Sequence, residues 1–308
     1  MAAPNPLCPL GRSASTLVTV HDTAAELNPP PELEGLRGSA AINTIHRPRL
    51  HFGTGADGIE RLEASLIGEA FSPHRHDRYA IGITLRGVQT FQYRGERHFC
   101  LPGDGHILHP DETHDGAAGT DQGFGYRIIY LDPALVRDAL GGAPLPFVAD
   151  PVIRRRDVDP VLVASLADLG QQLGDFVRLE IAVGIANMLR KHSGTRPRRT
   201  VPLPLGPLAR VRDMIADDPT VRHSVAEFEG ASGLDRWTIA RQFRAAYGTS
   251  PTRFRTMRQL DRARALLRAR VPIATAALDA GFADQSHLSR MFKQTYGLTP
   301  ARWAAALG

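Results

Sequence analysis

The stretch from Asp235 to Phe254 is repeated 49 residues later, from Asp284 to Trp303. The two copies, DRWTIARQFRAAYGTSPTRF and DQSHLSRMFKQTYGLTPARW, are identical at seven of their twenty positions. A match at a fixed offset indicates a duplicated supersecondary unit. The C-terminal part of the chain is therefore restricted to folds that contain two similar units in tandem.

Each copy has the pattern of one capped helix. An aspartate opens it, a glycine follows its last helical residue, and a proline stands three residues beyond the glycine. At 100° per residue, the apolar side chains fall on one side of each helix. These buried sides comprise Ile239, Phe243 and Tyr247 in the first copy and Leu288, Phe292 and Tyr296 in the second. The outward sides carry Trp237, Arg241 and Arg244, and Ser286, Arg290 and Lys293.

A shorter helix is expected before each copy, across a glycine turn. The two short helices are Val225–Ser232 and Ile273–Ala280. Helix, glycine turn and capped helix form the helix-turn-helix pattern, whose second helix enters the DNA major groove. The segment Thr252–Arg270 joins the two units and has apolar residues at helical spacing, so it is expected to be a bridging helix.

This arrangement resembles the AraC/XylS family of bacterial transcription regulators, and the segment GFADQSHLSRMFKQTYGLTP carries the resemblance most closely. The resemblance implies sequence-specific binding to double-stranded promoter DNA, with RNA polymerase as a further candidate partner. Arginine can donate two hydrogen bonds to guanine, although an exposed helix face that touches only phosphates is the alternative. The candidate DNA-contacting residues are Arg236, Trp237, Arg241, Arg244, Gln285, Ser286, His287, Ser289, Arg290 and Lys293.

The charge distribution is consistent with a nucleic-acid partner for the C-terminal part alone. Residues 201–308 contain sixteen Lys plus Arg and nine Asp plus Glu, a net charge of +7, within a chain of net charge +5. Arginine is abundant throughout, so charge alone does not decide the function. No apolar run is long enough to span a membrane, and the two cysteines, Cys8 and Cys100, lack metal-ligand spacing. A cytoplasmic protein without a membrane partner is expected.

The N-terminal half is expected to be rich in short strands separated by glycine turns. The predicted strands are Ile59–Ile67, Tyr79–Leu85, Val88–Tyr93, His98–Leu101, His106–His109 and Tyr126–Leu131. Such spacing without intervening helices favours a double-sheet jelly roll or barrel. The segments FSPHRHDRY, LPGD and HPDETH, within Phe71–Pro133, resemble the small cupin barrel that forms the sensor half of many regulators in the same family.

The predicted fold is α+β with two domains. Residues 1–38 form a flexible leader, residues 39–192 a cupin-like effector-sensing and dimerisation domain with flanking helices, residues 193–207 a linker, and residues 208–308 an all-α DNA-binding domain. Helices are expected from Pro160 to about Leu173 and from Asp175 to about His192. The apolar positions of the second helix could cover the barrel or form a dimer interface. The resemblance favours a homodimer.

Three histidines of the barrel, His74, His76 and His114, are candidate ligand-binding residues. Three imidazoles suit a transition metal. The catalytic cupin pattern also supplies a glutamate, however, and Ala80 and Ile81 stand in its place. We therefore expect no metal, cofactor or catalytic residue, and predict an effector pocket in which Tyr79 and Tyr93 are apolar walls.

The sequence is thus interpreted as an effector-controlled transcription regulator of the AraC type, and not as an enzyme. One alternative is a metal-dependent cupin enzyme with an accessory DNA-binding domain. Another is a regulator that works without a ligand.

Overall fold

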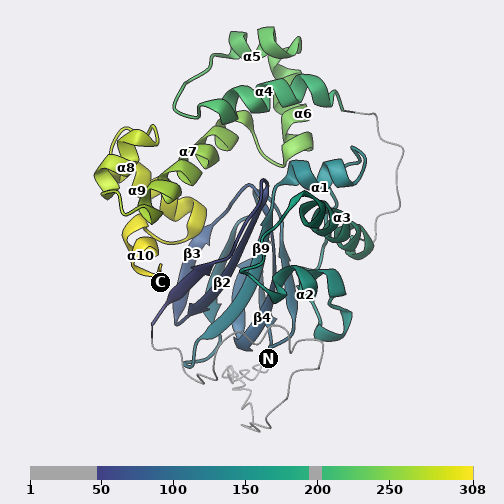
Figure 1. The fold of residues 1–308 in the computed structure, drawn as a ribbon, viewed down its shortest axis with the longest axis vertical. Helices are drawn as coiled ribbons and strands as arrows, with labels where there is room; N and C mark the ends of the chain where they lie inside the picture. Colours follow the sequence, from purple (N-terminus) through teal and green to yellow (C-terminus); the bar gives the residue numbers. More distant parts are fainter. Residues whose placement is uncertain (1–46, 194–202, 308) are drawn as a thin grey trace, which may run out of the picture.

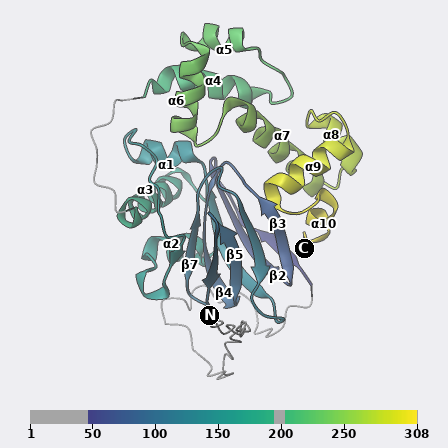
Figure 2. The ribbon, with the colours of Figure 1, turned by 180° about the vertical axis from the view of Figure 1, so that it is seen from behind.

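The computed structural model describes residues 47–193 and 203–307. The predicted leader and most of the predicted linker lie outside these ranges. A β-barrel forms one domain and a group of helices forms the other (Figure 1). Helices α1–α3 cover one side of the barrel, α8–α10 lie against another side, and α4–α6 lie across one end (Figure 2).

The barrel consists of two antiparallel sheets, as the predicted jelly roll requires. The first has the order β1-β2-β9-β4-β7-β10 and the second the order β3-β8-β5-β6. The strands are β1 (Arg49–Phe52), β2 (Ile59–Leu66), β3 (Glu69–His74), β4 (Tyr79–Gly87), β5 (Gln89–Tyr93), β6 (Glu96–Cys100), β7 (Gly105–Leu108), β8 (His114–Ala118), β9 (Phe124–Leu131) and β10 (Val152–Ile153).

Alternation along the central strands separates two apolar layers. On β9, Tyr126 and Ile128 belong to the barrel interior, whereas Ile129 and Leu131 belong to the layer beneath the helices. On β4, Ala80 faces the interior, whereas Tyr79 and Ile81, before and after it in sequence, face the helices. Successive side chains of a strand point to opposite faces, so a two-residue period in one strand supplies both layers.

Three α-helices and one short 3₁₀ turn complete this domain: α1 (Pro133–Ala139), η2 (Arg155–Asp157), α2 (Pro160–Ala167) and α3 (Asp175–His192). Asp132 and Asp159 cap α1 and α2, and each is followed by proline. Buried Arg61 donates to carbonyl oxygens of Ser165, Asp168, Leu169 and Gln171, at and beyond the C-terminal end of α2. The Arg61 guanidinium thus links α2 to the barrel, because it donates hydrogen bonds to carbonyl groups that have no partner within the helix.

The second domain contains α4 (Leu205–Asp217), α5 (Val225–Ser232), α6 (Arg236–Tyr247), α7 (Pro251–Arg268), α8 (Ile273–Asp279), α9 (Gln285–Tyr296) and α10 (Pro300–Ala305). Asp235 accepts hydrogen bonds from two backbone amides of α6, and Asp284 accepts one in α9. Gly248 and Gly297 end these helices with φ of 73° and 69°, the left-handed region that glycine favours. The duplicated unit therefore has the predicted capped-helix form in both copies.

Several boundaries differ from the prediction. Helix α4 begins at Leu205, inside the predicted linker, and α2 ends at Ala167 rather than near Leu173. Strands β1, β3, β8 and β10 and helix α1 were not predicted. Strand β3 contains Pro73, and β8 has the sequence HDGAA, which contains neither a β-branched nor a bulky apolar residue. Their pairing with each other, rather than local propensity, makes them strands.

No helix within the described residues is long and apolar enough to cross a membrane.

Candidate functional site

The second helix-turn-helix unit shares its apolar core with the barrel. Leu288, Phe292 and Trp303 belong to the same buried cluster as Tyr126 and Ile128 of β9. Backbone hydrogen bonds also join the two domains: from Ser72 N to Gly297 O (3.1 Å), from Arg75 N to Gln294 O (3.2 Å) and from Leu50 N to Ala306 O (2.8 Å). In this conformation the end of α9 is therefore docked on β3.

The first unit is docked through α1. Arg137, which is buried, donates from Nη1 to the carbonyl oxygen of Ala246 at 2.6 Å, and its guanidinium carbon lies 4.8 Å from the centre of the Tyr247 ring. A Cβ added to Gly248 would lie 2.9 Å from Pro110, so the C-cap of α6 also touches the barrel. Both reading helices thus contact the sensor domain through their C-terminal ends.

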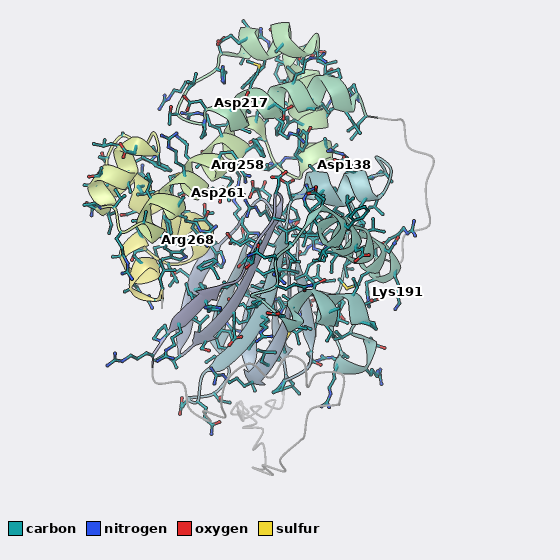
Figure 3. The ribbon with its side chains drawn as sticks, in the orientation of Figure 1. Asp138, Lys191, Asp217, Arg258, Asp261 and Arg268 are labelled. Atoms are coloured by element: carbon teal, nitrogen blue, oxygen red, sulfur yellow. The ribbon has the colours of Figure 1, made fainter. Side chains whose placement is uncertain are left out.

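A layer of paired charges lies between α7 and the barrel, and we call it the charged layer. Its arginines are Arg78, Arg258, Arg264 and Arg268, and its carboxylates are Glu60, Asp77 and Asp261. Within this layer, the shortest pairs across the two domains are Arg258–Asp77 and Arg264–Glu60, both 2.7 Å, and Arg78–Asp261, 3.0 Å. Figure 3 places Arg258 and Asp261 where α7 approaches the barrel.

Burial and pairing act against each other on the carboxylates of this layer. Burial raises the pKa of Asp77 and outweighs the attraction of Arg258. Burial also opposes ionisation of Asp261, but the nearby Arg78, Arg258 and Arg264 lower its pKa overall. The surrounding arginines therefore hold Asp261 in its ionised form.

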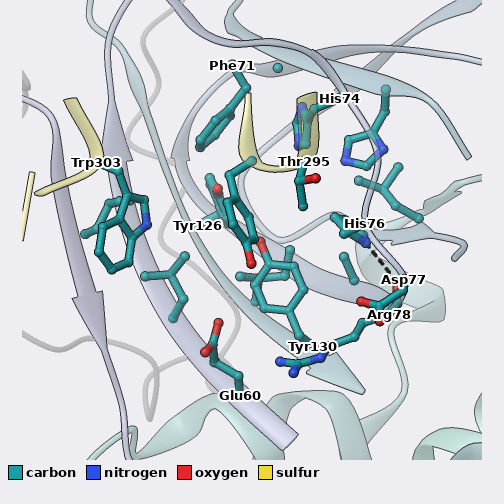
Figure 4. Close-up of a pocket in the computed structure, with 18 of the residues that line it drawn as sticks. Glu60, Phe71, His74, His76, Asp77, Arg78, Tyr126, Tyr130, Thr295 and Trp303 are labelled. Atoms are coloured by element: carbon teal, nitrogen blue, oxygen red, sulfur yellow. Dashed lines mark hydrogen bonds between the residues drawn. The ribbon is translucent and has the colours of Figure 1, made fainter. Parts of the chain in front are cut away.

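A cavity of about 80 Å³ lies beside the charged layer, and both domains line it. From the barrel it is lined by, among others, Phe71, His74, His76, His106, His114, Tyr126 and Tyr130, and from the second domain by Met257, Asp261, Arg264, Thr295, Tyr296 and Trp303. In Figure 4, His74 and His76 lie on one side and Trp303 on the other, with Tyr126 and Tyr130 between them.

The three predicted histidines come together on one wall of this cavity. The ring centre of His114 lies 4.3 Å from that of His74 and 4.9 Å from that of His76. Each Nδ1 is bonded to a backbone carbonyl: His74 to Ser72 (2.8 Å), His76 to Arg78 (2.8 Å) and His114 to Glu112 (3.0 Å). Burial lowers the pKa of all three, that of His114 to about 4. The imidazoles are therefore neutral at physiological pH.

Tyr79 and Tyr93 do not line this cavity, which corrects their predicted place as its walls. Tyr79 stands on the face of β4 opposite to Ala80, beneath the helices, and its hydroxyl donates to Pro146 O at 2.9 Å. The Tyr93 hydroxyl lies 3.0 Å from His109 Nδ1. Tyr126 and Tyr130 take the position expected for them.

Several residues of the cavity were missed at the sequence level. Tyr126 and Tyr130 stand four residues apart in a predicted strand, and that spacing places them on one face. Asp261 and Arg264 lie in the helix that was predicted only as a bridge between the two units. Tyr296 was predicted to be a core residue of its helix, but it also lines the cavity. Charged residues at i and i+3 on a partly apolar helix are the signal that could have marked α7 as part of the site.

The predicted DNA-contacting residues lie on two outward helix faces. Trp237 is 70 % exposed, and Arg241, Gln285, Ser286, Arg290 and Lys293 are exposed as well. His287 and Ser289 are half-buried. Two of the predicted contacts form ion pairs with carboxylates of the protein in this conformation: Arg236 pairs with Glu229 (3.2 Å) and Arg244 pairs with Asp111 (3.1 Å).

Among the residues that the structure describes, no group of three or more His, Cys, Asp or Glu side chains is arranged to hold a metal ion.

Two family profiles match the chain, one in each domain. Residues 58–185 match the family described as an AraC-like ligand binding domain, and residues 230–306 match a family described as a helix-turn-helix domain. The first match covers strands β2–β10 of the barrel and most of α3, and the second covers α6–α10.

Similar proteins align with about three quarters of the chain. The protein named uncharacterized HTH-type transcriptional regulator YbfI of Bacillus subtilis is 24% identical over 250 residues, which cover 78% of this chain and 87% of that protein. The arabinose operon regulatory protein of Salmonella typhimurium is 26% identical over 237 residues, which cover 74% of this chain and 83% of that protein.

Solved structures of ToxT from Vibrio cholerae have the same fold. One superposes with a TM-score of 0.57 at 12% identity and covers 81% of this chain and 99% of ToxT. ToxT bound to an unsaturated fatty acid superposes with a TM-score of 0.56 at 13% identity and covers 85% of this chain and 98% of ToxT.

The buried histidines predict how stability depends on pH. In the unfolded chain, histidine side chains bind protons near pH 6.5. In the folded chain, the pKa values of His74, His76 and His114 are lowered, and burial lowers the pKa of His106 to about 3. The stabilisation is therefore complete above pH 6.5 and is lost as the pH falls towards the folded pKa values. Each such histidine adds up to about 1.4 kcal/mol per pH unit to the decrease in the free energy of unfolding.

Urea unfolding of the intact chain between pH 7.5 and pH 5 measures this slope. His114→Asn removes one titrating group, so the slope should decrease by the equivalent of one proton. An unfolding free energy that is constant over this range would contradict the neutral, buried state of the imidazoles.

Proposed function

The chain belongs to the AraC family of DNA-binding transcription regulators, and from this premise we propose that a small-molecule effector in the cavity controls how the two helix-turn-helix units bind promoter DNA. The observation that carries the proposal is the composition of the cavity wall, to which the sensor barrel and helices α7, α9 and α10 all contribute.

A ligand that touches both domains binds best when they are docked. It can shift a conformational equilibrium only by the difference in its affinity for the two states. A molecule held between His76 of the barrel and Tyr296 of α9 loses the second set of contacts when the domains separate. The effector therefore favours the docked arrangement.

The docked arrangement occupies part of the DNA-binding surface. Asp111, in the loop before β8, forms ion pairs with Arg253 (2.8 Å), Arg244 (3.1 Å) and Arg75 (3.6 Å). Arg244 lies on the outward face of α6, where it would reach DNA. A buried carboxylate thus holds an arginine that could otherwise contact a phosphate. This supports a docked state with reduced affinity for DNA, from which loss of the effector releases the reading helices.

Promoter recognition is assigned to the outward faces of α6 and α9. Arg290 is exposed on α9 and its side chain makes no hydrogen bond or ion pair with any described residue, so its guanidinium is available for base edges. Trp237, exposed on α6, can pack against thymine methyl groups or sugars.

We also propose that the protein is a homodimer that pairs through α3. One face of this helix is buried on the barrel through residues such as Ile185 and Leu189. The opposite side exposes Phe176, Leu179 and Val183, with exposed fractions of 84%, 51% and 44%. Three apolar residues at i, i+3 and i+7 form a stripe that a second copy of the helix can cover.

Leu179→Asp tests the dimer, because a charge at the centre of the stripe opposes burial. Sedimentation of the intact chain should show a shift from dimer to monomer. Glu180→Asp, a conservative change on the exposed surface beside the stripe, is the control. A wild-type chain that sediments as a monomer at concentrations sufficient to bind DNA would contradict the proposal.

Arg290→Ala tests base reading by α9. Loss of a bidentate contact should cost about 1–3 kcal/mol of DNA-binding free energy and relax the preference at one or two base pairs. Selection from a random DNA library followed by affinity measurements reports both effects. Arg262→Ala, an exposed arginine on α7, should at most weaken binding to all sequences equally. If both variants lost affinity uniformly, Arg290 would be only a phosphate contact.

Asp111→Asn tests the link between docking and DNA binding. Asp111 has a φ of 62°, which asparagine tolerates well, so the variant removes charge with little effect on the backbone. Without the three ion pairs, the docked state is weakened and affinity for the selected DNA should rise about fivefold. Asp121→Asn, an exposed carboxylate of the barrel, should leave the affinity unchanged. A fall in affinity in Asp111→Asn would show that docking assists DNA binding.

A further inference from the structure

We infer that the cavity accepts a small uncharged molecule that donates hydrogen bonds, through hydroxyl groups, to the Nε2 atoms of His74, His76 and His114. The inference rests on the proposed effector role of the cavity and specifies the chemical class of the effector. Three features of the wall carry it: the proton positions of the imidazoles, the charges already paired there, and the size of the space.

The proton positions follow from the carbonyl partners. A carbonyl oxygen can only accept a hydrogen bond, so the Nδ1 atoms of His74, His76 and His114 must carry the protons. In a neutral imidazole the other nitrogen is then an acceptor. No hydrogen bond to any of these three Nε2 atoms is made by the described residues. One wall of the cavity therefore presents three acceptors, and a ligand that satisfies them must donate.

Anionic ligands are opposed by the charges of the wall. Four carboxylates line the cavity, Glu60, Asp77, Asp115 and Asp261, against two guanidiniums, Arg78 and Arg264. Both guanidiniums are already paired, Arg78 with Asp261 at 3.0 Å and Arg264 with Glu60 at 2.7 Å. A ligand carboxylate would add negative charge to a wall that already has an excess of carboxylates, and on the histidine side it would meet lone pairs.

Three of the four carboxylates offer little to a cationic ligand, because arginines already pair with them. Glu60 and Asp261 are held by arginines, Asp77 accepts from Arg258 at 2.7 Å, and Asp115 accepts from the backbone nitrogen of Gln92 at 2.6 Å. An ammonium group would have only Asp115 as a counter-ion, and three neutral acceptors do not fully offset the remaining desolvation cost. An uncharged donor avoids this cost.

The size and the remaining lining select a compact molecule. A cavity volume of about 80 Å³ has room for only a few water molecules, each of which takes about 30 Å³ in the liquid. Phe71, Tyr126 and Trp303 offer apolar ring faces to its carbon atoms. His106, which is fully buried and also lines the cavity, has no hydrogen-bond partner on either ring nitrogen. A hydroxyl group both donates and accepts, so it can satisfy whichever of these nitrogens it reaches.

The test compares molecules that share a carbon skeleton and differ in charge. Glycerol, glycerate and 2-amino-1,3-propanediol form the three-carbon set, and erythritol, erythronate and 4-amino-1,2,3-butanetriol form the four-carbon set. Each is titrated into the full-length chain while the Tm is measured. We expect a saturable rise in Tm with at least one of the two alcohols and none with the acids or amines.

Histidine variants show whether the response arises in the cavity. In His76→Asn and His114→Asn, the amide nitrogen can replace Nδ1 toward the carbonyl while the Nε2 acceptor is lost. The saturable rise should disappear in both variants and persist in His51→Ala, which removes an exposed imidazole outside the cavity. If an acid or an amine stabilised the wild-type chain through these histidines, or if neither alcohol did so, the inferred ligand class would be wrong.

DNA affinity measured with the same compounds separates this inference from the proposed function. An acid that stabilises the chain and changes DNA affinity would refute the ligand class and leave effector control intact. An alcohol that stabilises the chain without changing DNA affinity would support the ligand class and refute effector control.

Discussion

The docking of the two domains depends on the charged layer between α7 and the barrel. Arg258 and Arg264 cross from α7 to Asp77 and Glu60, and Arg78 crosses from the barrel to Asp261. Buried ion pairs contribute little net stability, because desolvation offsets most of the attraction, but an unpaired buried charge is costly. Such a layer therefore tolerates few arrangements of the domains. In the docked arrangement the charges of the layer are paired with one another, and when the domains separate they are exposed to water.

This balance suits a switch. The two domains share an apolar core, and their cavity lies beside charges whose net contribution to docking is small, so a modest ligand affinity can decide which arrangement is populated. The coupling is reciprocal: a ligand that favours docking lowers the affinity for DNA, and DNA lowers the affinity for the ligand by the same factor. The side chain of Arg244 can pair either with Asp111 of the sensor domain or with DNA, so the two compete for it.

The sequence predicted the repeated units closely, since their caps and glycine stops are local signals that recur at a fixed offset. It also predicted the jelly roll and the meeting of His74, His76 and His114. It did not predict β3 and β8 as strands, because pairing rather than propensity defines them, and it misplaced Tyr79, whose strand position selects the face beneath the helices. The composite wall with Asp261 and Arg264 depends on how the two domains meet, and no local pattern encodes that contact.

The distance between the domains, measured by electron spin resonance, tests the central claim most directly. Spin labels on introduced cysteines at Arg97 of the barrel and Asp279 of α8, both exposed, report it in a chain from which Cys8 and Cys100 have been removed. With a stabilising ligand, we predict one narrow distribution at the distance of the docked structure. With the selected DNA, the distribution should move to a different distance. The same narrow distribution in the free, ligand-bound and DNA-bound chain would contradict control by docking.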